Sequence, residues 1–408
     1  MMQPPISSPA SRWRLISAIP TRVRRLIVLT SPISLSTGYM FVFVTAYLPQ
    51  IGIGSAAIGL MLGANGFAMI LSAIPLGLLS DRWGRKWILL AAAVAVPPSL
   101  LVFALTTNVV YLVLANVVMG VADGAFLATW NAIIADQTTT EQRDAAFSLS
   151  FILGNVTMGV GFALPLAFPL VQAWTGLDSS TVHTEAMTLA AALAVLTPLF
   201  AWLLLRDYVE VRHARAKRAR GMRWGPLLTF SGLNGLIGLG AGFIIPLIPL
   251  WFFLKFGVPD TFSGPLLAVS NITIGLAAVV SAALSRRYGP VRAIVMAEGL
   301  ATGFMLSLAF AGNPVLAGGL YLVRAALMNM SSPLADSFLM GIIEPEQRGF
   351  ASAINSIVWR LPNSVTTILG GILFAAGNYD LPIYLATLFY AVAVTGFYVA
   401  FRNVKPGT

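Results

Sequence analysis

Long apolar runs, separated by short polar loops, fill almost the whole chain. Apolar and polar residues do not alternate within them, as they would in the strands of a membrane β-barrel. Each run is also longer and more uniformly apolar than a half-buried soluble helix needs. A bilayer core about 30 Å thick is crossed by about 20 helical residues. The pattern therefore predicts twelve transmembrane helices, at residues 26–51, 57–79, 87–106, 109–134, 146–172, 185–205, 226–253, 262–284, 293–312, 314–341, 351–376 and 382–401.

Composition supports a membrane protein and excludes other classes. Of 408 residues, 57% are hydrophobic and only 10% are charged, whereas soluble chains carry about 25% charged residues. A cytosolic enzyme, a disordered chain and a disulfide-built secreted domain are all excluded, the last because there is no cysteine. The first apolar run is long enough to span and lacks a small-residue cleavage site, so it is interpreted as a retained helix, not a signal peptide.

The basic residues predict the orientation of the chain. Of the 25 Lys and Arg, 22 lie in the loops and tails on one side of the predicted membrane. By the positive-inside rule both termini and the long central loop are cytoplasmic, which predicts a multi-pass protein of the plasma (inner) membrane. The net charge of +10 is then attributed to attraction for anionic lipid head groups, and no nucleic-acid partner is expected.

An internal repeat divides the chain near its midpoint. Shifting the sequence by 205 residues places Glu141-Gln142-Arg143 on Glu346-Gln347-Arg348, and Gly84 on Gly289. The predicted organisation is a basic N-terminal segment (1–25), a six-helix bundle (26–205), a cytoplasmic linker (206–225), a second six-helix bundle (226–401) and a short tail (402–408). Two such halves are common among secondary transporters, whose substrate site lies between them near the bilayer midplane.

The loop after the second predicted helix carries the most specific motif. Gly77 permits a close helix approach, Gly84 permits a tight turn, and the charges cluster at the cytoplasmic helix end. The string Gly77-Leu78-Leu79-Ser80-Asp81-Arg82-Trp83-Gly84-Arg85-Lys86 resembles the signature loop of the major facilitator superfamily. Its copy in the second half, around Gly289, is degenerate. The resemblance implies an all-α membrane fold of two pseudo-symmetric six-helix halves. The matching residues are Gly77, Asp81, Arg82, Gly84, Arg85 and Lys86.

In that family this loop controls conformational exchange and does not contact substrate. Carried over, Asp81 would hold the inward-closed arrangement by pairing with the other half. The alternative is a loop that only forms the turn and sets topology. The segments around Arg143 and Arg348 resemble the family's loops after helices 4 and 10, and a gating or structural role is expected for them.

Ionisable residues inside the predicted spans are the first functional candidates, because each costs about 2.5–3.5 kcal/mol to insert on translocon scales. Asp123, Glu298 and Asp336 are candidates for proton coupling. Arg324 and Arg360 are candidates for the substrate cavity, which the family resemblance places between helices 1, 4, 7 and 10 with 2, 5, 8 and 11 beside them. The alternatives are an ion pair for Asp123 and a partner in Arg292 or Arg348 for Glu298.

Polar and aromatic side chains at similar depth complete the candidate pocket. Intramembrane amides either bind a solute or hold helices together by hydrogen bonds. His183 and Glu185, in contrast, lie at the outer end of a predicted helix, and no special role is assigned to them. The pocket candidates are Asn155, Asn271, Asn329, Trp130, Tyr39 and Trp359.

The sequence lacks the residues that several kinds of site require. Neither His lies in a predicted span and Cys is absent, so no metal site is expected. There is no phosphate-binding loop and no intramembrane Ser-His pair, so neither an ATP-driven pump nor a hydrolase is expected. No enzyme activity and no cofactor are predicted, and the energy for transport would come from an ion gradient.

Three functions remain. The leading hypothesis is a monomeric, proton-coupled secondary transporter that moves a small organic solute by alternating access and favours efflux. The second is an organic-anion or metabolite carrier that uses the intramembrane Arg residues. The third is a non-transporting receptor or scaffold with the same fold. The expected partners are a small-molecule substrate, protons and the lipid bilayer.

Overall fold

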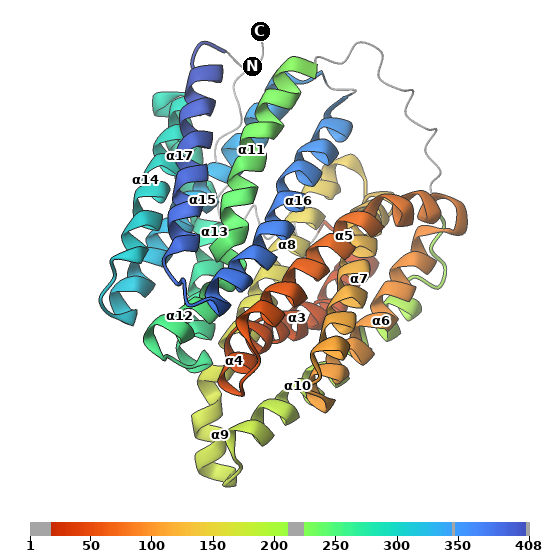
Figure 1. Ribbon diagram of the computed structural model, residues 1–408. Coiled ribbons are helices and arrows are strands. Elements are labelled where there is room, and N and C mark those ends of the chain that lie inside the picture. Colours follow the sequence, from red (N-terminus) through yellow and green to blue (C-terminus); the bar gives the residue numbers. More distant parts are fainter. Residues whose placement is uncertain (1–17, 211–223, 345–346, 405–408) are drawn as a thin grey trace.

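The computed structural model describes residues 18–210, 224–344 and 347–404, and in these residues every regular element is helical (Figure 1). Parts of the predicted N-terminal segment (1–17), linker (211–223) and tail (405–408) lie outside the described residues. The N-terminal half contains α2 (Thr21–Thr30), α3 (Pro32–Val42), η1 (Phe43–Tyr47), α4 (Leu48–Gln50), α5 (Ser55–Trp83), α6 (Arg85–Leu105), α7 (Val109–Asp136), α8 (Thr140–Ala163), η2 (Leu164–Ala167), α9 (Phe168–Thr175) and α10 (Ser179–Leu204). The C-terminal half contains α11 (Trp224–Ile244), η3 (Ile245–Leu247), α12 (Ile248–Phe256), α13 (Asp260–Tyr288), α14 (Pro290–Ala309), α15 (Pro314–Ile342), α16 (Arg348–Ala375) and α17 (Leu381–Phe401).

These helices confirm the all-helical membrane fold. Ten helical stretches of the described residues are long and apolar enough to cross a membrane. α13 and α15 coincide with the remaining two predicted spans. Two starts differ most from the prediction: α8 begins at Thr140 and α10 at Ser179, whereas the pattern placed these spans from residues 146 and 185. His183 therefore lies inside a helix and is buried.

The internal repeat appears in the helix boundaries. α5 ends at Trp83 and α13 ends at Tyr288, 205 residues later. Gly84 and Gly289 follow them with φ of 101° and 81°, a region that side chains with a Cβ seldom adopt. Each glycine N–H donates to a carbonyl four residues back, at 2.9 Å. The two halves thus turn the same corner with the same backbone geometry.

The halves meet along two pairs of helices. α5 packs on α16 and α8 packs on α13, and each pair joins one half to the other. Small residues allow this approach: a Cβ built on Gly59 of α5 would lie 2.9 Å from the Cα of Gly371 on α16. At this point α5 and α16 are therefore in backbone contact, with no side chain between them.

Three helices change geometry near the end of the bundle opposite the termini, which we call the far end (bottom of Figure 1). The helix of α3 and α4 contains the π-helical segment η1, whereas 3₁₀ segments η2 and η3 precede α9 and α12. Prolines explain the interruptions, because Pro49, Pro165 and Pro246 each lack the N–H that would bond four residues back. Short helical tips, α4, α9 and α12, result.

Large side chains close the bundle at the far end. Tyr39, Tyr47, Trp251 and Phe252 are at most 4% exposed and belong to one core that joins both halves. The opposite end, where α11 begins and α17 ends (top of Figure 1), is called the terminal end.

Candidate functional site

Adjoining cavities occupy the centre of the molecule, where the two halves face each other. One, of about 430 Å³, is lined from the N-terminal half by Asn65, Met69 and Asp123, and from the C-terminal half by Trp359 and Arg360. Asp123 and Met69 also line a second cavity of about 400 Å³ beside α2 and α3. Arg360 lines a third, of about 520 Å³, inside the C-terminal half. Shared walls make these spaces neighbours around one carboxylate and one guanidinium.

Asp123 and Arg360 form the electrostatic centre of this site. Asp123 lies on α7 in the N-terminal half and lines the cavity beside Asn65 of α5, whose side-chain amide donates to the Asn116 backbone carbonyl at 3.2 Å. Arg360 lies on α16 in the other half, close enough for its positive charge to act on Asp123. Its guanidinium also reaches the Met69 sulfur, at 3.7 Å. The two opposite charges therefore interact across the interface of the halves.

The cavity in the C-terminal half is the more polar of these spaces, and it contains several predicted residues. Arg324 is 5% exposed, and its guanidinium donates to the Tyr390 hydroxyl at 2.6 Å. Its Nε is buried with no hydrogen-bond partner among the described residues. Glu298, 6% exposed, lies beside Ser331. The wall also includes Asn329, Asp336, Trp359 and Arg360.

Three other predicted residues differ in their access to these cavities. Trp130 lines the cavity beside α2 and α3, and its indole N–H donates to the Ser150 hydroxyl at 2.9 Å. Asn329 donates to Thr273 at 3.3 Å. Tyr39 is fully buried, and its hydroxyl donates to the backbone carbonyl of His183, so it packs in the core of the far end. Among the described residues, no ion pair joins Glu298 to Arg292 or Arg348.

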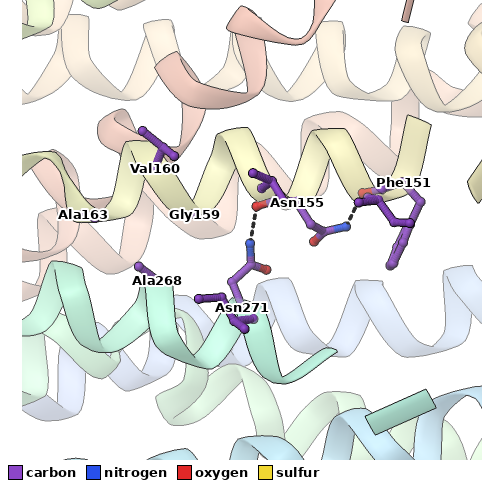
Figure 2. Close-up of a pocket in the computed structure, with 10 residues that line it drawn as sticks. Phe151, Asn155, Gly159, Val160, Ala163, Ala268 and Asn271 are labelled. Atoms are coloured by element: carbon purple, nitrogen blue, oxygen red, sulfur yellow. Dashed lines mark hydrogen bonds between the residues drawn. The ribbon is translucent and has the colours of Figure 1, made fainter. Parts of the chain in front are cut away.

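Asn155 and Asn271 lie together, but in a different place. They line a groove of about 430 Å³ between α8 and α13, with Phe151, Val160 and Ala268 (Figure 2). Asn271 donates to the Asn155 backbone carbonyl at 2.6 Å, and the Asn155 side chain donates to the Phe151 carbonyl of its own helix. Phe151 is 59% exposed, so the groove faces outward, and here the two amides join the halves.

The signature loop forms a charged cluster at the terminal end. Arg85 contacts Asp136 at 2.7 Å and Glu210 at 3.4 Å, and the Tyr208 hydroxyl also donates to Asp136. Burial and the neighbouring Asp136 carboxylate raise the pKa of the Tyr208 phenol above its ordinary value. Asp81 is 62% exposed and lies 3.9 Å from Arg85 within its own loop.

The remaining loop residues lie nearby or point to solvent. Gly77 lies on α5 against Ala128, and Gly84 makes the turn, with Arg82 exposed beside it. Lys86 donates to the Arg206 carbonyl at 3.2 Å, and Arg143 donates to the Ala135 carbonyl at the same distance. Arg348 is exposed. Among the described residues, no group of His, Asp and Glu is arranged to hold a metal ion.

Comparison with known proteins places this architecture in a family. The model of the Major Facilitator Superfamily matches residues 26–323 and 230–408. This chain belongs to the major facilitator superfamily. Multidrug resistance protein 1 of Bacillus subtilis (strain 168) is 23% identical over 379 residues, which cover 88% of this chain and 91% of that protein. Tetracycline resistance protein, class C, of Escherichia coli is 28% identical over 306 residues, or 71% and 73% of the two chains.

Solved structures share the fold of this major facilitator transporter. A bacterial homologue of the human lysosomal transporter Spinster, in an inward-facing and occupied conformation, superimposes with a TM-score of 0.74. The superposition covers 98% of each chain at 14% identity. At that identity the likeness is one of fold.

The sequence did not single out some residues that shape the transporter's cavity. Met69 lines three of its cavities but is uncharged, and Asn65, one intramembrane amide among several, lines the central one beside Asp123. Tyr390, an aromatic residue inside the last predicted span, accepts a hydrogen bond from Arg324. Helical periodicity could have placed Asn65 and Met69 on one face of α5, four residues apart. Nothing local could have shown that this face meets α7 and α16.

Proposed function

We propose that this major facilitator protein is a proton-coupled secondary transporter that exports small, partly apolar organic compounds. It acts as a monomer in the plasma (inner) membrane, with both termini in the cytoplasm. Asp123 is the proton site, and the central cavities hold the solute. In this orientation the far end, which large side chains close, lies on the outside.

The observation that carries the proposal is that Asp123 and Arg360, from opposite halves, line the same central cavity. When Asp123 is ionised it attracts Arg360, and this attraction favours the conformation that brings the two charges nearer. A proton on Asp123 removes the negative charge and weakens that attraction. Proton binding would therefore change the relative energies of the two conformations, which is the requirement for coupling.

The cavity lining supports organic solutes with apolar parts. Met40, Phe41, Met119, Met158 and Phe162 contribute to the central wall around the two charges. Thioether and aromatic side chains adapt to differently shaped apolar groups. The relatives named for multidrug and tetracycline resistance support export as the direction.

The test is solute-evoked proton flux in proteoliposomes that contain a pH-sensitive dye. Wild type is compared with Asp123→Asn over cationic, neutral and anionic compounds. We expect flux with at least one class of compound in the wild type and loss of the proton signal in Asp123→Asn. The matched control is Asp144→Asn, because Asp144 is an exposed carboxylate on α8, and its flux should equal that of the wild type.

Two results would overturn the proposal. Undiminished solute-evoked flux in Asp123→Asn would remove this carboxylate from coupling. Compound binding with no movement of solute or protons would support the receptor or scaffold function instead.

A second candidate, an organic-anion carrier, is favoured by Arg324. This guanidinium is buried in the C-terminal cavity, has an unpartnered Nε, and takes part in none of the ion pairs among the described residues. A carboxylate or phosphate would supply the missing acceptors. Arg324→Gln should abolish binding of anionic compounds if this candidate is correct, whereas Arg287→Gln, an exposed control, should not. Unchanged anion binding in Arg324→Gln would exclude it.

A further inference from the structure

A buried polar contact joins the two halves at the far end, away from the central site. His183 lies on α10 of the N-terminal half, and Asp260 is the first residue of α13 in the C-terminal half. His183 Nε2 lies 2.9 Å from Asp260 Oδ2, and both side chains are at most 3% exposed. Gln50, at the end of α4, contacts the other carboxylate oxygen at 3.0 Å. Three segments therefore converge on one carboxylate.

The hydrogen-bond partners determine where the protons of this contact must lie. His183 Nδ1 is 2.7 Å from the backbone carbonyl of Ser179, and a carbonyl only accepts, so Nδ1 carries a hydrogen. The Gln50 amide nitrogen also donates to the Ala46 carbonyl at 2.8 Å, which identifies the donor end of that amide. Asp260 Oδ1 therefore accepts from Gln50, and Oδ2 faces the remaining ring nitrogen.

A neutral His183 with its proton on Nδ1 would present a bare lone pair to an ionised carboxylate at 2.9 Å, and both atoms would be acceptors. The contact needs one more proton, held between Nε2 and Oδ2. The Gln50 hydrogen bond and the N-terminus of α13 favour an ionised carboxylate, so the proton belongs on the imidazole. The closed contact is thus a protonated pair.

Aromatic side chains of the closed far end surround this pair. The Tyr47 ring stacks on the imidazole with centroids 3.7 Å apart, and Phe168 packs edge-on at 4.8 Å. The titratable groups that face His183 in the described structure are Asp260 of α13, Tyr47 of η1 and, through its hydroxyl on the His183 carbonyl, Tyr39 of α3. Among these groups the described residues form one ion pair, between His183 and Asp260.

We propose that His183 and Asp260 form a second proton-binding site, a latch whose protonation closes the far end of the transporter. Separating the halves at this end pulls the two side chains apart and lets the proton leave. Acid on the far side therefore favours closure, and alkali favours opening. This site deepens the proposed function, on which its outward orientation and its consequence for export rest. For an exporter it means that external acidity holds the carrier closed to the outside, against re-entry of expelled solute.

The latch is tested by the separation of the halves, without any transported compound. Because the chain has no cysteine, Ser180→Cys and Asn378→Cys place two spin labels at exposed far-end positions, one on each half. Their distance is measured by double electron–electron resonance in lipid nanodiscs from about pH 5 to about pH 8, the interval in which histidine ordinarily titrates. In the wild-type background the ratio of short to long distances should fall by up to about tenfold per pH unit, the limit for one linked proton.

Two variants distinguish a requirement for the proton from a requirement for side-chain packing alone. Asp260→Asn has almost the same shape, and its amide can donate to a neutral imidazole, so the far end should close without a proton and acid should no longer promote closure. His183→Gln offers a fixed donor to Asp260 and should be insensitive to pH. Asp123→Asn should keep the full wild-type response, so failure of the latch is distinguishable from failure of the proposed coupling site. A wild-type distance distribution that does not change with pH, or a full response in Asp260→Asn, would overturn the proposal.

Discussion

Replacing Gly59 by alanine is expected to shift the protein toward the conformation in which the far end is open. Gly59 lies one turn into α5, near the far end, and faces α16 of the other half. Its added Cβ would lie 2.9 Å from both the Gly371 Cα and the Thr367 carbonyl oxygen. These are backbone atoms, which cannot rotate away, so the two helices must separate.

The size of the effect follows from the cost of overpacking. Forcing one methyl group into a closely packed contact costs about 1–3 kcal/mol. The methyl is accommodated without cost where α5 and α16 move apart, so the whole cost acts on the equilibrium between conformations. That corresponds to a shift of about 5–150-fold in favour of the open far end. The Ser180 and Asn378 spin-label pair should report it as growth of the long-distance population.

Two glycines provide the controls. Gly120 of α7 is as crowded, because its Cβ would lie 2.2 Å from the Asn65 carbonyl oxygen, but this contact is within one half. Gly120→Ala should lower thermal stability without changing the distance distribution. Gly232→Ala, with no atom within 4 Å of its added Cβ, should change neither. The reasoning fails if Gly59→Ala lowers stability and leaves the distances as they are, since the clash would then be present in both conformations.

Two further predictions concern the signature loop. Asp81→Asn should reduce transport and leave solute binding largely intact, since Asp81 lies outside every cavity described and is 62% exposed; an equal loss in flux and binding assays would argue against a gating role. Arg85→Lys should lower stability by about 1–3 kcal/mol, because one ammonium cannot replace a guanidinium that contacts both Asp136 and Glu210. Thermal unfolding in detergent measures this, with the exposed Arg82→Lys as control and an unchanged midpoint as the contradicting result.

The fold was predictable because its signals are local and repeated. Uninterrupted apolar runs report membrane spans directly, and the same glycine 205 residues apart, at Gly84 and Gly289, reports the two related halves. The helix boundaries were harder to predict, because hydropathy does not show how far a helix continues beyond its apolar span. α10 extends to Ser179 because Asp178 caps its first turn by accepting from the Ser180 N–H at 3.1 Å.

The candidate site was predictable only in part. Insertion cost alone identifies Asp123, Arg324 and Arg360, because charges in a span need a reason. Depth in the membrane does not say which side of a helix a residue occupies, so Asn155 and Asn271 were grouped with the cavity although they line an outward groove. His183 was given no role for a similar reason. Its importance depends on Asp260, 77 residues away in sequence, and only the packing of the halves brings the two together.

The helical tips at the far end have a mechanical consequence. α4, α9 and α12 each follow a segment of irregular helix and each precede a glycine with positive φ, namely Gly52, Gly176 and Gly257. Each tip is therefore a short helix between two segments whose backbone departs from the α-helix. The side chains that close this end can then move apart by local bending of the tips, while the long helices stay packed. We therefore expect the far end to open first at these tips, before the long helices separate.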